Sequence, residues 1–282
     1  MLDGPATELP WVWAGLAAYA LATFAAVQNL VWQRNNSLVL TRASERVVHA
    51  ALWGAVILLT IALAERWIRT GHGPFVNLFE LLISQMFSLG LVYVVVYWRY
   101  KVLRPTAVVV LPILWIMGIW LLTLEPEVVP YPPTYYNNWK WAHVIFGKFF
   151  LAFLLIATGL AGIILIRKIK ALTSFFNHMP ADKILDNFAW RFMMLALAFD
   201  SLMLIAGAVW AQDAWGRYWA WDALETSAFI NWLAIGMCIH ARLSYRVPLN
   251  VGAVAIIVLF AFAFFTYFGT PFVSEAAHKG VV

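Results

Sequence analysis

Eight apolar runs, most of them about 20 residues long, follow one another along this sequence. A helix needs about 20 apolar residues to cross the hydrocarbon of a membrane, where its backbone must satisfy its own hydrogen bonds. The runs therefore predict an all-α polytopic membrane protein with about eight transmembrane helices. The expected spans cover residues 11–33, 47–67, 77–98, 106–124, 141–166, 187–211, 225–245 and 249–269.

Composition supports a single membrane-embedded domain over residues 1–282. The chain is 63% hydrophobic and only 12% charged, whereas soluble proteins carry about 25% charged residues. In such a chain the net charge of +5 reports orientation in the membrane. We therefore expect no nucleic-acid partner.

Basic residues gather in alternate connections between the apolar runs. By the positive-inside rule these connections face the cytoplasm. Both termini and the connection at about residues 210–226 are then expected outside. The basic set comprises Arg34, Arg42, Arg46, Arg99, Lys101, Arg104, Arg167, Lys168, Lys170, Lys183, Arg242 and Arg246.

A few charges do not fit this pattern. Arg66 and Arg69 fall on the expected outer side, where they either snorkel to the interface or have a specific use. Lys148 lies within the fifth span and Asp200 within the sixth. A charge in hydrocarbon costs several kcal/mol, so we expect both to avoid the lipid, although snorkelling is also open for Lys148.

The connection Trp215–Thr226 reads "WGRYWAWDALET". Interfacial enrichment of Trp and Tyr explains one or two such rings, but not this concentration. If the segment were helical, Trp215 and Trp219 would share a face. The aromatic surface suits a large, flat ligand that carries carboxylates, and heme is such a ligand.

Three charged residues in this connection have different expected roles. Arg217 is the nearest candidate partner for a heme propionate, because guanidinium can pair bidentately with a carboxylate. Asp222 and Glu225 instead orient a histidine, hold Arg217 or cap the following helix. Capping is favoured for Glu225, since a carboxylate is stabilised in the first helical turn.

Heme iron needs axial ligands, and histidine is the usual one. His143 and His278 fall on the same expected side as the aromatic connection, so they could ligate one iron from two sides. His240 lies inside the seventh span and is either a second candidate ligand or a structural histidine. The other histidines are expected at the surface: His49, His72 and His178.

Two segments of the sequence resemble a known family. "GAVWAQDAWGRYWAWDALET", followed by "FINWLAIGMCIHARL", resembles the WWD motif of the heme-handling proteins of cytochrome c biogenesis, most closely the CcsA/ResC branch. "RWIRTGHGPFVNLFELLIS" is similar to a second segment of that branch. The similarity extends over about residues 50–280. The usual Pro-Lys after the aspartate is replaced by Ala223-Leu224.

The resemblance implies roles for single residues. His143 and His278 match paired external histidines that ligate heme iron, and His240 matches an intramembrane histidine that holds heme on its way across. Asn77 and Glu80, with Glu225 and Thr226, match supporting positions. The residues that would form the heme platform are Trp215, Gly216, Tyr218, Trp219, Trp221 and Asp222.

The implied function is that of a heme-handling subunit of a cytochrome c synthetase. It would hold heme b, as a transient or resident group, for attachment to the CxxCH thiols of an apocytochrome c. The implied partners are a ResB/CcsB-type membrane protein and a thioredoxin-like reductant. Cys238 is the single cysteine, which is consistent with thiols that arrive on the substrate. The implied location is a bacterial-type inner membrane or a thylakoid membrane, with the active face outside.

Two other classes of protein remain open from the sequence. A membrane electron-transfer subunit would keep its hemes bound and relay electrons between redox partners. A transporter would need polar or broken helices near the bilayer midplane, and Asp200 is the midplane carboxylate that supports it.

Overall fold

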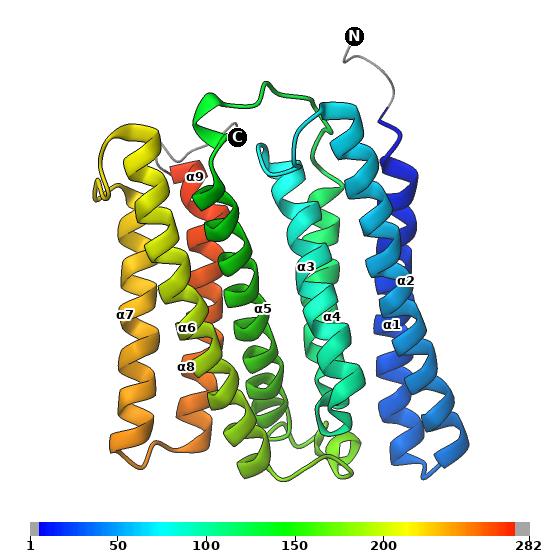
Figure 1. Cartoon of the computed structure of the whole chain (residues 1–282). Coiled ribbons are helices and arrows are strands. Elements are labelled where there is room, and N and C mark those ends of the chain that lie inside the picture. The colour runs from blue at the N-terminus through cyan, green and yellow to red at the C-terminus, as the bar shows by residue number, and fades with distance from the viewer. Residues whose placement is uncertain (1–5, 274–282) are drawn as a thin grey trace.

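The computed structural model describes residues 6–273, which form a bundle of eight long helices and a short ninth (Figure 1). This architecture confirms the prediction of an all-α polytopic membrane protein. The helices are α1 (Leu9–Arg34), α2 (Leu38–Thr70), α3 (Leu78–Arg99), α4 (Ala107–Leu121), α5 (Asn138–Ile166), α6 (Asp182–Trp215), α7 (Ala223–Ser244), α8 (Leu249–Phe264) and α9 (Thr270–Val273). A π-helical turn, Phe265–Gly269, joins α8 to α9.

Helices α3 and α5 lie in the interior of the bundle. Of the candidate membrane spans they have the largest buried share. Helix α5 packs against α6 and α8 on one side and against α3 and α4 on the other. The α1–α2 pair lies at the far edge, against α3 and α4 (Figure 1). Any site on the inner face of α5 is therefore enclosed by helices from both halves of the chain.

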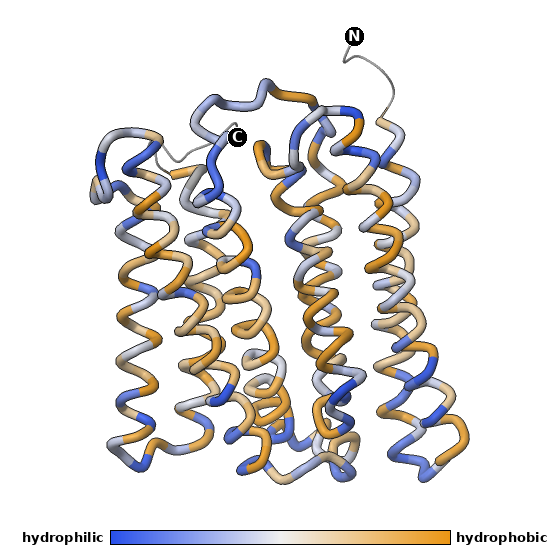
Figure 2. The backbone as a smooth tube through the Cα atoms, viewed as in Figure 1, coloured by the Kyte–Doolittle hydropathy of each residue, from blue (hydrophilic) through white to orange (hydrophobic). Residues whose placement is uncertain are grey.

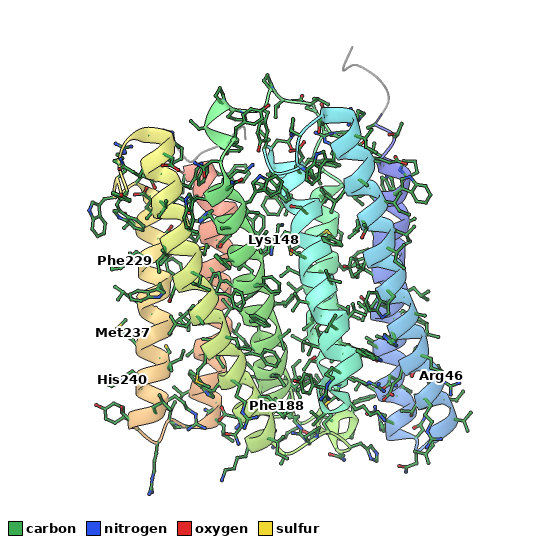
Figure 3. All side chains as sticks on the ribbon, in the orientation of Figure 1. Arg46, Lys148, Phe188, Phe229, Met237 and His240 are labelled. Atoms are coloured by element: carbon green, nitrogen blue, oxygen red, sulfur yellow. The ribbon has the colours of Figure 1, made fainter. Side chains whose placement is uncertain are left out.

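Several helices extend beyond the apolar runs from which they are predicted. Helix α2 begins at Leu38 rather than near residue 47, so Arg42 and Arg46 lie on its first turns. Arg46 lies near the basic end of the bundle (Figure 3). Backbone hydrogen bonding does not require apolar side chains, so a helix can continue past the hydrocarbon into polar surroundings.

Within residues 6–273, seven helices are long and apolar enough to cross a membrane. The long helix outside this group is α7, although it runs beside α6 and α8 through the bundle (Figure 1). Helix α7 carries Glu225, Asn231, His240 and Arg242, which lower its mean hydropathy. This polarity distinguishes the helix that directly follows the aromatic connection.

The two ends of the bundle differ in chemistry. Polar residues mark both ends of the tube in Figure 2, and the start of α1 and the end of α9 lie at the same end (Figure 1). The basic connections lie at the opposite end, as expected from the sequence; that this end is cytoplasmic stays a prediction. Ion pairs tie segments together there: Arg104–Glu45, Arg167–Asp182 and Arg242–Asp186.

Arg66 anchors the end that carries the aromatic connection. Its side chain is 0% exposed and lies 2.9 Å from carboxylate oxygens of both Glu8 and Glu80. It also donates to the carbonyl of Pro126 at 2.7 Å, and Arg69 pairs with Glu8. Arg66 therefore has a specific use, which is to hold α1, α2, α3 and the connection before α5 together.

Candidate functional site

A pocket opens near this end between α3, α5, α6, α7 and the π-helical turn. It encloses about 1420 Å³, including the open space at its mouth. Most of its wall is apolar, and its polar groups are few, which is typical of sites for organic ligands. The apolar lining includes Leu78, Leu81, Val144, Leu204, Ala208, Leu224, Ala228 and Phe268.

The connection between α6 and α7 forms one edge of the pocket. Helix α6 ends at Trp215, and Gly216 follows in a left-handed conformation with φ +72°, which glycine adopts without strain. The possible helical register of Trp215 with Trp219 is therefore wrong, because Gly216 terminates the helix between them. Tyr218 and Trp219 line the pocket.

Trp219 is the central ring of this edge. Its ring centroid lies 5.8 Å from that of Trp221 and 6.3 Å from that of Phe229, with both pairs edge-on. Its Nε1 is buried without a hydrogen-bond partner among the described residues. Trp221 is 66% exposed and does not line the pocket. The connection thus presents one ring inward and another outward.

Asp222 and Glu225 build the start of α7. Asp222 is the N-cap, and its Oδ1 accepts a hydrogen bond from the Glu225 backbone N–H at 2.8 Å. The Glu225 Oε2 accepts from the Ala220 N–H at 2.6 Å, and the Thr226 N–H donates to the Asp222 carbonyl. Glu225 thus reaches back past the N-cap and holds the chain that leads into α7, in a variant of the capping box. Glu225 also lines the pocket.

Asn77 and Glu80 build an equivalent start on the opposite side of the pocket. The Asn77 Oδ1 accepts from the Glu80 N–H at 2.9 Å, and the Glu80 carboxylate accepts from the Val76 N–H at 2.9 Å. The Asn77 amide also donates to the Glu127 carbonyl at 2.9 Å. These two residues support the wall of the pocket, which Val76 lines.

His143 projects from α5 into the same pocket. Its Nδ1 lies 2.9 Å from the Met203 carbonyl oxygen, and since a carbonyl only accepts, Nδ1 carries the proton. In the neutral ring the lone pair is then on Nε2, the arrangement of a metal-ligating histidine oriented by a carbonyl. Gly207 permits this contact, because a Cβ at that position would lie 2.6 Å from Nδ1.

The cations that line the pocket are lysines of α5. Lys140 donates to the Tyr131 hydroxyl at 3.0 Å, and Lys148 donates to Ser84 Oγ at 3.0 Å. Figure 3 shows Lys148 between α5 and α3. Arg217 is exposed and is not part of the lining, so its pairing with a propionate stays a prediction. Sequence reasoning missed Lys140, although its spacing from His143 places both on one side of a helix.

Both charges singled out within the spans avoid the lipid, which confirms that expectation. Lys148 lines the pocket, as described above. Asp200 is 1% exposed on α6. Ser201, its neighbour, accepts a hydrogen bond from the Trp232 indole at 2.8 Å, which joins α6 to α7 at this level.

The other histidines occupy different surroundings. His240 is exposed on α7, toward the basic end of the bundle (Figure 3), so it does not share the pocket with His143. His278 lies outside the described residues. His72 is buried against Tyr131 at a centroid distance of 4.8 Å, so its expected surface position is wrong: the connection after α2 folds inward.

Known proteins resemble this chain in sequence. The family described as "Cytochrome C assembly protein" matches residues 75–278. Cytochrome c biogenesis protein CcsA of Guillardia theta is 31% identical over 253 residues, which cover 80% of this chain and 82% of that protein. CcsA of Chlamydomonas reinhardtii is 27% identical over 252 residues, covering 86% and 71%.

The fold is also found in a solved structure. The cytochrome c heme lyase CcmF superimposes with a TM-score of 0.64 at 18% identity, over 93% of this chain and 46% of CcmF. This chain thus spans about half the length of that protein. The match to the family extends over most of the sequence and includes the pocket, the aromatic connection and His143. The chain therefore belongs to the cytochrome C assembly protein family.

Proposed function

We propose that this protein is the heme-handling subunit of a cytochrome c synthetase and that the pocket beside α5 holds heme for attachment. One observation carries the proposal: His143, oriented by the Met203 carbonyl, shares an apolar pocket with Trp219 and Tyr218 of the aromatic connection. The site thus combines an imidazole nitrogen suited to iron with aromatic faces suited to a macrocycle.

The residues present fit heme as the substrate. The wall is largely apolar, as a porphyrin face requires. Three polar atoms of lining residues are buried without partners among the described residues: Gln85 Nε2, Trp219 Nε1 and Thr266 Oγ1. Buried polar groups are normally hydrogen-bonded, so these atoms are suited to bind a molecule in the pocket, water, or a segment outside residues 6–273.

Each part of the chain would perform a separate task. His143 would supply one axial nitrogen, and His278 of the C-terminal segment would supply the second. Trp219 and Tyr218 would support the macrocycle, with Trp215, Gly216, Trp221 and Asp222 shaping the connection that presents them. The capped starts of α3 and α7 would hold the two walls in place. The chain would thus act by positioning, which lowers the entropic barrier of the reaction.

The chemistry would belong to the substrates. Heme b supplies two vinyl groups, and each cysteine of an apocytochrome CxxCH segment adds its sulfur and its hydrogen across one vinyl to form a thioether. Cys238 is the chain's single cysteine, so the reacting thiols would come from the apocytochrome. A ResB/CcsB-type protein and a thioredoxin-like reductant would complete the system.

His240 would serve a separate step. Its position on the outward face of α7 suits a ligand for heme that is shared with a neighbouring membrane protein. The pocket would then face the outer side of a bacterial inner membrane or a thylakoid membrane, because the basic connections lie at the opposite end of the bundle.

The purified protein tests this proposal. We expect an optical spectrum and a pyridine hemochrome assay to detect protoheme, and mass spectrometry to identify a copurifying ResB/CcsB-type chain or an apocytochrome. Absence of heme under all preparation conditions would contradict the proposal. Stoichiometric heme with copurifying redox subunits would instead support the alternative, a membrane subunit that relays electrons.

A further inference from the structure

Two lysines lie on the pocket side of α5, with His143 between them in sequence. Lys140 precedes His143 by one turn, and Lys148 follows it by little more than one turn. All three line the pocket. Eight residues of helix rise about 12 Å, so the side chains are staggered along one wall.

The two ammonium groups converge on a single ring. The Nζ of Lys140 lies 5.8 Å from the Phe75 centroid, and the Nζ of Lys148 lies 5.3 Å from it. Lys140 also lies 4.8 Å from the Tyr131 centroid and 4.3 Å from that of Tyr135. These rings attract a cation through their faces but do not neutralise it.

Neither amine lies within ion-pair distance of a carboxylate in residues 6–273. No ion pair in that range involves Lys140 or Lys148. Each has one hydrogen-bond acceptor, Tyr131 for Lys140 and Ser84 for Lys148, although an ammonium has three donors. The wall around His143 thus carries two lysine amines whose hydrogen-bonding capacity is not used up.

We propose that Lys140 and Lys148 bind the two carboxylates of the ligand, an inference that rests on the proposed function. The two propionates of heme leave the macrocycle from one edge, so a pair of cations on one wall fixes both and orients the ring. His143 lies between these cations in sequence, so iron and carboxylates are recognised by one helix face. Arg217 is exposed and lies outside the lining, so its pairing with a propionate is a separate prediction.

Esterified heme separates this role from a purely structural one. We would reconstitute the wild type, Lys140→Met, Lys148→Met and the double variant in phosphatidylcholine nanodiscs. Affinities for iron protoporphyrin IX and its dimethyl ester would be measured from tryptophan quenching and the Soret band. Lys170→Met is the matched control, because Lys170 is exposed in the connection between α5 and α6.

The wild type should bind the free acid more tightly than the ester. Each lysine variant should weaken the free acid about tenfold, as expected for loss of a charge-assisted hydrogen bond. Ester binding should be unchanged in the variants, which also shows that their pockets are folded. In the double variant the preference for the free acid should disappear, and Lys170→Met should match the wild type.

Other results would overturn the inference. Equal weakening of acid and ester would make the lysines structural, and an unchanged preference in the double variant would exclude them as partners. Anionic phosphatidylglycerol that competes with the ester in the wild type but not in the variants would assign the lysines to a lipid headgroup. A wild type that binds neither porphyrin would overturn the proposed function itself.

Discussion

Two connections flank the pocket and share one backbone design. In residues 71–77 and in residues 216–222 a left-handed glycine ends a helix, with φ +75° at Gly71 and +72° at Gly216. Each connection ends in an N-cap, Asn77 or Asp222, that accepts from the N–H of a glutamate three residues later. In each case that glutamate accepts an N–H from before the cap.

The side chains of the two connections differ. His72, Val76 and Asn77 are buried, and Glu80 is clamped by Arg66. In the other connection Tyr218 is 60% exposed and Trp221 66% exposed. The same local structure therefore gives a fixed support on the α3 side and an accessible aromatic surface on the α7 side. A site that receives and releases a large substrate needs both.

Removal of the clamp should have the largest effect. Arg66→Met leaves the carboxylates of Glu8 and Glu80 buried without their guanidinium. We expect a loss of about 3–5 kcal/mol in the free energy of unfolding, measured by thermal or denaturant unfolding in detergent. Arg69→Met should cost much less, since Arg69 is only partly buried. If Arg66→Met were as stable as the wild type, the α3 side would not be a fixed support, and its contrast with the accessible α7 side would be lost.

A change on the accessible side should affect binding rather than stability. Trp219→Ala removes the inward ring, and we expect the affinity for iron protoporphyrin to fall about tenfold. Trp98→Ala is the matched control, since that exposed ring near the end of α3 lies outside the lining; its affinity should stay within about twofold of the wild type. Titration of both variants by tryptophan quenching gives the answer, and equal losses would show that the lining is wrongly assigned.

Loss of either N-cap should lower the free energy of unfolding by less than loss of Arg66, and the loss should be larger on the α3 side. Asp222→Ala should lower the free energy of unfolding by about 1 kcal/mol through loss of the N-cap. Asn77→Ala should cost about 2 kcal/mol, because it also loses the hydrogen bond to Glu127. Asn77→Ser keeps a capping oxygen and loses only the hydrogen bond to Glu127, so it should lower the free energy of unfolding by less than Asn77→Ala. A larger loss of stability for Asp222→Ala than for Asn77→Ala would contradict the assignment of the α3 side as the fixed support.

The smallest expected effect concerns pH. Burial by itself raises the pKa of the Glu8 carboxyl, but hydrogen bonds and charge from Arg69 and Arg66 outweigh it and hold the pKa below its usual value. Its stabilisation is thus present at neutral pH and is lost as the pH falls through the lowered folded-state pKa. Melting temperatures of the wild type should decline more steeply on acidification than those of Glu8→Gln. Parallel curves would mean that Glu8 does not stabilise the clamp electrostatically.

The sequence predicts the helices better than the contacts between them. Apolar runs locate all eight long helices, because the hydrocarbon thickness sets their length. Helix ends are less predictable: α2 begins nine residues before its apolar run, at Leu38 rather than residue 47. A helix can continue through charged residues beyond the hydrocarbon, so the end of an apolar run does not mark the end of the helix.

The site is only partly visible in the sequence. His143 and Trp219 are found from composition and motif, and the structure brings both to the pocket. Lys140 is missed, because it looks like an ordinary interfacial lysine until the Tyr131 and Tyr135 rings fold over it. Arg217 is favoured by proximity along the chain, yet it follows Gly216, where α6 ends, and its side chain is exposed outside the lining.

A spectrum of His143→Gly tests the proposed heme ligand most directly. We propose that His143, held by the Met203 carbonyl, supplies an axial nitrogen to heme iron in the pocket. We predict that His143→Gly loses or shifts the heme spectrum and that added imidazole partly restores it, while the unfolding temperature stays near that of the wild type. A wild-type heme spectrum in His143→Gly without imidazole would contradict the claim.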